Sequence, residues 1–412
     1  MSVRPEEMRV AEFDRGKVLL IPPMEPMGAR LFAAAFRHAG FDARVLREDG
    51  QTLALGLKHT AGGECAPCPT TLGSLLHAFE GPGAPDPDRT LFFMPTACGP
   101  CRFGQYTQLG RLVLEKLGLG GVRMVAPSAE NAYAGMDLDS RQRLWHAVVA
   151  SDVARKLVHR VRPYETEPGS VDGLAEELLA QWEKDLAGSP TDAMYATLER
   201  FARRFESLPR AGKPRPVVGV VGEIYVRANP FLNQDLCRRI ESLGGEAWLA
   251  PLSEWVLYTS HIRALYARRD RFSPAALVER ARTWLEENLF FVRVEHRYYD
   301  SAGPALADRR EPDIDAVMKA GGAYAPWEFE GESLLTLGRT ALFFARDGVR
   351  AVVNAAPMFC MPGTITTSIF PRLEKEFGRP VVCNFYDGSG DPNQSLVPMM
   401  HYFTHHETES EA

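Results

Sequence analysis

The chain has 412 residues, of which 45% are hydrophobic and 24% are charged, and it carries a formal net charge of −6 at pH 7. This size predicts two or three globular domains, and the negative charge argues against nucleic acid as the main partner. The longest apolar runs have the length of strands, so we expect no helix that spans a membrane. Residues 2–15 are charged and do not resemble a signal peptide, which favours a cytoplasmic location.

Residues 1–165 are predicted to form an N-terminal α/β domain. Strand-like and helix-like apolar patterns alternate along them, which is typical of a parallel sheet covered by helices. The expected elements are a strand at 17–22, a helix at 28–40, a strand at 41–46, a loop at 56–68, a helix at 70–80, a strand at 90–95, a helix at 104–117, a strand at 121–127 and a long helix at 138–161.

Two Cys-x-x-Cys pairs lie in this domain. Cys65 and Cys68 enclose Ala-Pro and precede the helix at 70–80, whereas Cys98 and Cys101 enclose Gly-Pro and follow the strand at 90–95. We expect both pairs in loops after strands and before helices, at the carboxyl edge of the sheet, where ligands of open α/β sheets bind. The helix N-termini at this edge also favour anionic thiolates and cluster sulfides.

A helical connector is expected at 166–212, followed by a second α/β domain at 213–400 and a disordered acidic tail at 401–412. The start of the second domain loosely repeats the first, as an internal duplication would. Its expected elements are a strand from 217, a helix at 231–244, a strand at 245–252, helices at 253–269, 274–288, 312–321 and 332–347, a strand at 350–356, a helix at 363–377 and a strand at 380–385. The predicted fold class is α/β, with two Rossmann-like or flavodoxin-like parallel-sheet domains and a helical connector.

The other three of the seven cysteines differ in their surroundings. Cys360 lies in Phe-Cys-Met-Pro-Gly-Thr-Ile after a predicted strand, and Cys383 lies in the last predicted strand, whereas Cys237 lies in an ordinary helical pattern. In a cytoplasmic protein, clustered cysteines indicate metal or redox chemistry rather than disulfides. We therefore interpret the two pairs, Cys360 and Cys383 as ligands of an iron–sulfur centre.

Other interpretations of the cysteines stay open at this point. Four thiolates in two pairs can bind zinc, although the spacing between these pairs exceeds that of a zinc ribbon. A thioredoxin-like redox site would explain one pair but not two. Cys360 and Cys383 can also be buried core residues. The small residues inside each pair favour a cluster, because they let sulfur atoms and a bulky group approach the backbone.

Three motifs carry a resemblance to a known family. They are Cys-Gly-Pro-Cys-Arg-Phe-Gly-Gln-Tyr at 98–106, Gly-Glu-Ile-Tyr-Val-Arg-Ala-Asn-Pro-Phe at 222–231, and Cys-Met-Pro-Gly-Thr-Ile at 360–365 followed by Tyr-Asp-Gly at 386–388. In this order they resemble proteins related to 2-hydroxyacyl-CoA dehydratases and their activators. The resemblance covers about residues 17–388.

The resemblance implies a cluster, a partner and an assembly. Members of the family hold an oxygen-sensitive cluster between α/β domains, and some relatives hold a double-cubane [8Fe–9S] cluster that would use six cysteines as metal ligands here: Cys65, Cys68, Cys98, Cys101, Cys360 and Cys383. A [4Fe–4S] cluster, which needs four or fewer, is the alternative. The family implies a homodimer. It also implies an ATP-hydrolysing iron–sulfur activator protein, here in trans, since the chain has no Walker A motif.

Five further residues are candidates for the site. Arg102, Gln105 and Tyr106 directly follow the second pair and are expected to contact the cofactor. His59 precedes the first pair and is a candidate proton donor, and Glu223 follows a buried strand where a substrate could be held.

These observations lead to one preferred function and two alternatives. The preferred one is a low-potential reductase or dehydratase component, reduced by the activator, that acts on a small molecule or an acyl-CoA. The first alternative is a non-catalytic electron carrier or accessory subunit. The second is a zinc-stabilised α/β binding protein.

Overall fold

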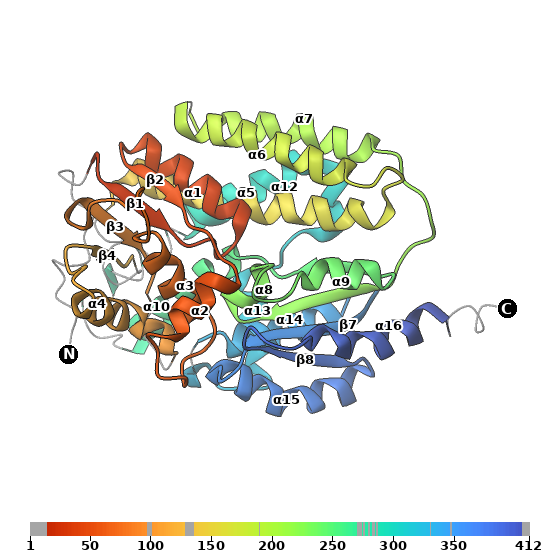
Figure 1. Cartoon of the computed structure of the whole chain (residues 1–412). Coiled ribbons are helices and arrows are strands. Elements are labelled where there is room, and N and C mark those ends of the chain that lie inside the picture. Colours follow the sequence, from red (N-terminus) through yellow and green to blue (C-terminus); the bar gives the residue numbers. More distant parts are fainter. Residues whose placement is uncertain are drawn as a thin grey trace.

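A computed structural model describes residues 15–96, 101–127, 136–188, 190–269, 287–329, 331–346 and 348–405, with isolated residues between 270 and 286. Its strands form two four-stranded sheets, in which all paired strands are parallel and helices flank the sheets (Figure 1). The predicted α/β class with two Rossmann-like or flavodoxin-like sheets is confirmed. Cys98, the tail from residue 406 and most of the helix expected at 274–288 lie outside the described residues.

The first sheet has the strand order β2-β1-β3-β4. Leu19 and Phe93 point into the core on one face of this sheet, and Leu20 and Phe92 point into the core on the other. Because both faces are covered, its central strands are nearly continuous apolar runs, as is usual for parallel sheets. The strands are β1 (Val18–Ile21), β2 (Asp42–Val45), β3 (Thr90–Phe93) and β4 (Arg123–Val125).

The helices around this sheet include one that the sequence pattern did not predict, α2. Asp49 starts it, because its carboxylate accepts hydrogen bonds from the backbone N–H groups of Gln51 (2.9 Å) and Thr52 (3.0 Å). The next helix begins at Pro67 rather than at residue 70, since proline is favoured in the first helical turn. The helices are α1 (Pro26–His38), α2 (Gly50–Leu57), α3 (Pro67–His77) and α4 (Tyr106–Lys116), with the 3₁₀ turn η4 (Arg102–Gln105) before α4.

The second sheet has the order β6-β5-β7-β8, which is the order of the first sheet when strands are counted along each half. The third strand of each half, β3 or β7, therefore lies beside the first, and the segments after these strands leave from equivalent edges. The strands are β5 (Val217–Gly222), β6 (Glu246–Leu249), β7 (Val349–Pro357) and β8 (Val381–Tyr386).

The helix predicted at 231–244 is correct only in its second part, where α9 spans Leu236–Ser242. A turn in which Gln234 and Asp235 have φ of 54° precedes α9, and the short helix α8 (Ile224–Ala228), which was not predicted, ends before this range. Proline at 230 has no N–H for a helix, and left-handed residues interrupt one. The expected disordered tail is also wrong in part, since helix α16 includes residues 401–405. The helices of this half are α8 (Ile224–Ala228), α9 (Leu236–Ser242), α10 (Ser253–Arg269), α12 (Val292–Ala302), α13 (Ile314–Gly322), α14 (Ser333–Phe344), α15 (Met361–Phe377) and α16 (Leu396–His405).

A helical layer packs beside the sheets and crosses the expected domain boundaries at 165 and 212. It consists of α5 (Leu138–Val161), α6 (Ser170–Gly188), α7 (Ala193–Ser207) and α12. The four helices share one core in which Leu157, Trp182 and Tyr298 are fully buried, and Figure 1 shows α6 and α7 at its outer side. The connector helices α6 and α7 thus pack with α5 from the first half and with α12 from the second. None of the described helices is both long enough and apolar enough to cross a membrane.

Candidate metal centre

The first cysteine pair lies at the start of helix α3. Cys65 is the last residue but one before the helix and Cys68 lies in its first turn, and the two are 7% and 3% exposed. The Cys68 N–H bonds the Cys65 carbonyl oxygen (2.9 Å), which brings the two residues into one tight turn. This differs in part from the predicted loop, because α2 separates the pair from strand β2.

Helices α2 and α3 cross at two glycines, and this crossing positions the pair. A methyl group on Gly73 would overlap the Thr52 carbonyl oxygen, and one on Gly56 would overlap the Pro69 carbonyl oxygen. The helix backbones therefore touch, which larger residues would prevent.

Replacing Gly73 by alanine is expected to push α3 away from α2 and to lower the free energy of unfolding by about 1–3 kcal/mol or more. Gly173→Ala in α6 is the matched control, since its added methyl group would meet nothing within 4 Å. The control should be neutral or stabilise the protein by roughly 0.5–1 kcal/mol. Urea unfolding measures both, and equal stability of the two variants would contradict this account of the crossing.

Of the second pair, the structure describes Cys101. This residue is half-buried and immediately precedes η4. The Phe103 N–H bonds its sulfur. Tyr106 opens α4 and links this segment to the first pair, because its hydroxyl lies 2.7 Å from the Cys65 sulfur. Cys101 follows β3 and precedes α4, as predicted for the pair, whereas Cys98 lies outside the described residues.

The second half of the chain contributes Cys360. Strand β7 ends at Pro357, and Cys360 is the N-cap of α15, where the Gly363 N–H bonds its sulfur at 3.3 Å. Phe359 takes the left-handed conformation (φ 64°) that turns the chain from strand to helix. Cys360 follows the third strand of its sheet, just as Cys101 follows the third strand of the first sheet.

The structure brings the thiols of Cys65, Cys68, Cys101 and Cys360 to one place. Cys65 interacts electrostatically with Cys68 and with Cys101, and Cys101 does so with Cys360. All four are free thiols. Among the described residues, no three His, Cys, Asp or Glu side chains are placed to hold a single metal ion. The four thiols therefore form a neighbourhood of soft ligands.

The two halves are also held together directly beside these thiols. Ala66, inside the first pair, packs in the same core as Tyr225 of α8. Glu48 accepts hydrogen bonds from the Tyr225 hydroxyl and from Asn229 Nδ2 (2.6 Å), and Asn229 also bonds the Pro23 carbonyl oxygen (2.9 Å). The polar residues after β5 thus build the contact between the halves.

Burial decides the protonation of the thiols. It raises the pKa of Cys65 to about 11 and the pKa values of Cys68 and Cys101 to about 12, and it raises the pKa of Cys360 as well. Without a metal these thiols are protonated near neutral pH. A metal that binds them must displace their protons, so its affinity rises with pH.

Two buried carboxyl groups face the thiols. Glu223 is the N-cap of α8 and accepts from the N–H groups of Tyr225 (3.1 Å) and Val226 (2.8 Å), while Glu332 accepts from Ile224 N–H (2.9 Å). Burial raises the pKa of Glu223, and burial together with the Glu223 charge raises the pKa of Glu332 well above its usual value. Burial and the repulsion between the two carboxylates therefore both favour the protonated form of the pair.

Glu332 is a site residue that sequence reasoning missed. It interacts electrostatically with Cys101 and Cys360. Glu332 directly precedes α14, which lies between the second strand (β6) and the third strand (β7) of its half. In the first half, the Cys65–Cys68 pair has the equivalent position at the start of α3, between β2 and β3. The repeat of strand order is the signal that could have found it.

Several predicted site residues lie apart from the thiols. Cys383 lies in β8 and packs beside Tyr324 and Phe377 in another core, where Asn354 Nδ2 approaches its sulfur at 4.0 Å. His59 lies half-buried in the turn that ends α2, where its N–H bonds the Gly56 carbonyl oxygen (3.0 Å). Their roles as ligand and proton donor stay predictions that this arrangement does not support.

The three residues predicted to contact the cofactor differ from one another. Arg102 is exposed and donates to the Gly63 carbonyl oxygen, so it fixes the loop that leads to Cys65. Gln105 is exposed and is the last residue before α4. Tyr106 alone of the three touches a cysteine, which makes it the strongest candidate among them.

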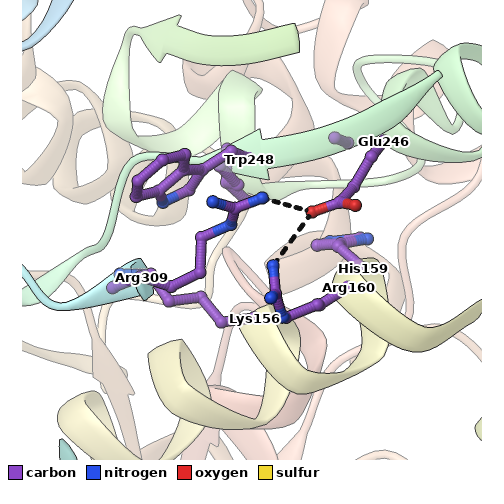
Figure 2. Close-up of a pocket in the computed structure, with 8 residues that line it drawn as sticks. Lys156, His159, Arg160, Glu246, Trp248 and Arg309 are labelled. Carbon is purple, nitrogen blue, oxygen red and sulfur yellow. Dashed lines mark hydrogen bonds and ion pairs between the residues drawn. The ribbon is translucent and has the colours of Figure 1, made fainter. Parts of the chain in front are cut away.

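One small cavity adjoins this region, and another lies elsewhere in the described part of the chain. One of about 10 Å³ lies behind Cys68 and Tyr106 and is lined by apolar side chains such as Leu72, Phe92 and Met124. The other, also about 10 Å³, lies beside α5, where Figure 2 shows Glu246 between Arg160 and Arg309. Each has room for about one water molecule, so neither is a substrate pocket.

The candidate metal centre is therefore the place where the carboxyl ends of β3 and β7 and the start of α3 meet, lined by four thiols and two carboxyl groups. A comparison of the chain with models of protein families and with characterised proteins found no match.

Proposed function

We propose that this chain is an iron–sulfur protein that works like the 2-hydroxyacyl-CoA dehydratase subunits it resembles. It is a low-potential reductase or dehydratase component that receives electrons from an ATP-hydrolysing iron–sulfur activator and acts on a small molecule or an acyl-CoA. The observation that carries this proposal is the meeting of Cys65, Cys68, Cys101 and Cys360 from both halves of the chain.

The donor set fits such a cluster. Buried cysteine thiols in apolar surroundings are the ligands that iron–sulfur clusters take. Each thiolate of a cluster binds its own iron, so the sulfurs need not converge on one ion. Cys65, Cys68, Cys101 and Cys360 would hold the cluster, one thiolate to each of four irons. The cluster would supply one-electron transfer at low potential.

The place of Cys383 bears on the size of the cluster. A double cubane was expected to use six cysteines, but Cys383 packs in the core between β8 and α15, away from the other thiols. This position supports a [4Fe–4S] cluster over the double cubane.

The variant Cys383→Ala is accordingly expected to keep the iron content of the wild-type protein when both are purified without oxygen. Its side chain is half-buried and contacts Asn354 rather than the other thiols. Loss of about half of the iron in this variant would instead favour the double cubane and Cys383 as its ligand.

The buried carboxyl pair favours an enzyme over an electron carrier. A carrier needs ligands and a route for electrons, whereas Glu223 and Glu332 place two buried carboxyl groups with raised pKa values beside the thiols. In a reductase or dehydratase component, these carboxyl groups would hold or move protons at the substrate.

Reduction of the anaerobic protein tests the proposal. With titanium(III) citrate, the visible absorbance near 400 nm is expected to bleach and an electron paramagnetic resonance signal of a reduced cluster to appear. The activator with ATP should produce the same signal. A colourless protein that binds zinc and accepts no electrons would overturn the proposal and leave the zinc-stabilised alternative. The chain is further proposed to act as a homodimer, which sedimentation measures.

A further inference from the structure

The hydroxyl group of Tyr106 contacts the sulfur of a proposed cluster ligand. Its oxygen lies 2.7 Å from the Cys65 Sγ, although the two residues are far apart in the sequence, since Cys65 precedes α3 and Tyr106 opens α4. Cys65 is 7% exposed, and Tyr106 is partly buried. This hydrogen bond therefore joins the two cysteine-bearing segments of the first half at the candidate metal centre.

Other aromatic rings hold the Tyr106 ring in place. It meets the Phe103 ring edge to face, with centroids 5.5 Å apart, and Phe103 meets the Trp255 ring of α10 in the same way at 6.2 Å. Such edge-to-face contacts are favourable beyond the burial of their surface. Because Trp255 belongs to the second half, both halves of the chain fix the position of the hydroxyl group.

The helix that carries Tyr106 also has little room to shift. A methyl group on Gly110, one turn after Tyr106, would come within 2.9 Å of the Met124 side chain, so α4 packs closely on strand β4. The Tyr106 ring also lines the small cavity behind Cys68, whose other walls are mostly apolar. A hydroxyl group in such surroundings is costly unless it has a hydrogen-bond partner, and the Cys65 sulfur is that partner.

The direction of this hydrogen bond follows from the chemistry of the ligand. In the free thiol either group can donate. A cysteine that binds a metal is a thiolate without a proton, so its sulfur only accepts and Tyr106 must be the donor. Cys360, by comparison, accepts from the backbone N–H of Gly363 (3.3 Å), a bond that no side-chain substitution at Gly363 removes. The bond to Cys65 can be removed by changing one side chain.

We propose that Tyr106 donates a hydrogen bond to the Cys65 thiolate when the cluster is bound, and that this bond raises the reduction potential of the cluster. Reduction increases the negative charge on the ligand sulfurs, so the hydrogen bond is stronger in the reduced state than in the oxidised state. No covalent bond forms or breaks, since one electron comes from the activator or from titanium(III) and the proton stays on the tyrosine oxygen. This inference rests on the proposed function, because it needs an iron–sulfur cluster at this site.

The midpoint potential of the anaerobically purified protein tests the proposal. Tyr106→Phe keeps the ring and removes the hydroxyl group, so this variant should keep the iron content of the wild-type protein. Its reduction should be roughly tenfold less favourable, which corresponds to a potential lower by about 59 mV for a one-electron step. A redox titration followed by electron paramagnetic resonance measures this potential. Tyr164→Phe is the matched control, because the Tyr164 hydroxyl donates to the Glu246 carboxylate (2.8 Å) instead of to a sulfur, and its potential should equal that of the wild type.

A second measurement detects the donated proton itself. Electron nuclear double resonance of the reduced protein, in water and in deuterated water, should show an exchangeable proton that is lost in Tyr106→Phe and kept in Tyr164→Phe. If Tyr106→Phe does not fold, a fluorotyrosine incorporated at position 106, whose hydroxyl group is a stronger donor, should raise the potential above that of the wild type. An unchanged potential together with an unchanged proton signal would overturn this inference and leave the proposed function standing. A protein that holds no iron and no sulfide would overturn both.

Discussion

Alanine in place of Cys101 or of Cys360 is expected to remove most of the iron and the visible absorbance from the anaerobically purified protein. Each residue supplies a buried or half-buried thiol to the same site from a different half of the chain. Removal of either would leave the proposed cluster short of one thiolate ligand. Iron content and the absorption spectrum measure the effect, which should be a loss of more than about half of the iron.

Cys237→Ala is the matched control for both substitutions. It also removes one thiol, yet Cys237 bonds His159 and lies apart from the candidate metal centre. The control protein should keep its iron and its colour. Loss of colour in Cys237→Ala together with retention in Cys101→Ala would overturn the ligand assignment.

Methionine in place of Arg339 is expected to lower the free energy of unfolding by about 3–5 kcal/mol. Arg339 lies in α14 and is 3% exposed; it bonds the Glu254 carboxylate through Nε (2.5 Å) and Nη2, and the Glu311 carboxylate through Nη1 (2.6 Å). Lys156 also pairs with Glu311, so Glu254 would lose its cation and stay buried as a lone charge. Methionine keeps much of the side-chain volume, which separates the loss of charge from the loss of packing.

An exposed pair provides the comparison for Arg339. Arg297 and Asp192 form an ion pair of 2.6 Å, but their side chains are 52% and 69% exposed. Arg297→Met should therefore change stability by only about 0–1 kcal/mol. Urea unfolding with equal slopes for both variants checks the difference. A similar small loss in both would show that the buried network stabilises the protein no more than a surface pair does.

The α/β class could be predicted from the sequence because both sheets consist of short apolar strands that alternate with helices. Residues 138–161 were predicted as one helix and form α5 with the same bounds. A strand that is buried on both faces is a nearly continuous apolar run, so it can be predicted without knowing which strands lie beside it.

Features that depend on a few polar contacts or on proline were harder to predict. Helix α2 is short and owes its start to the Asp49 carboxylate. The break between α8 and α9 depends on Pro230 and on the left-handed residues Gln234 and Asp235. In both segments the periodic apolar pattern is too short or too weak to show where a helix begins or ends.

The cysteines of the candidate site could be picked out in the sequence, but their arrangement in space could not. The two Cys-x-x-Cys pairs and Cys360 stand out in the sequence, whereas Glu332 has no motif around it. Whether Cys383 joins the other thiols depends on which way its side chain leaves β8, and that follows from the sheet register rather than from the residues beside it.

The content of iron, acid-labile sulfide and zinc per chain, in protein purified without oxygen, tests the proposed iron–sulfur centre most directly. About four iron and four sulfide per chain are expected from the cysteines that the structure brings together. About eight iron would still support a cluster but would require Cys383 as a ligand. Zinc in a one-to-one ratio with the chain, with no sulfide, would contradict the proposed function and leave a structural metal site in its place.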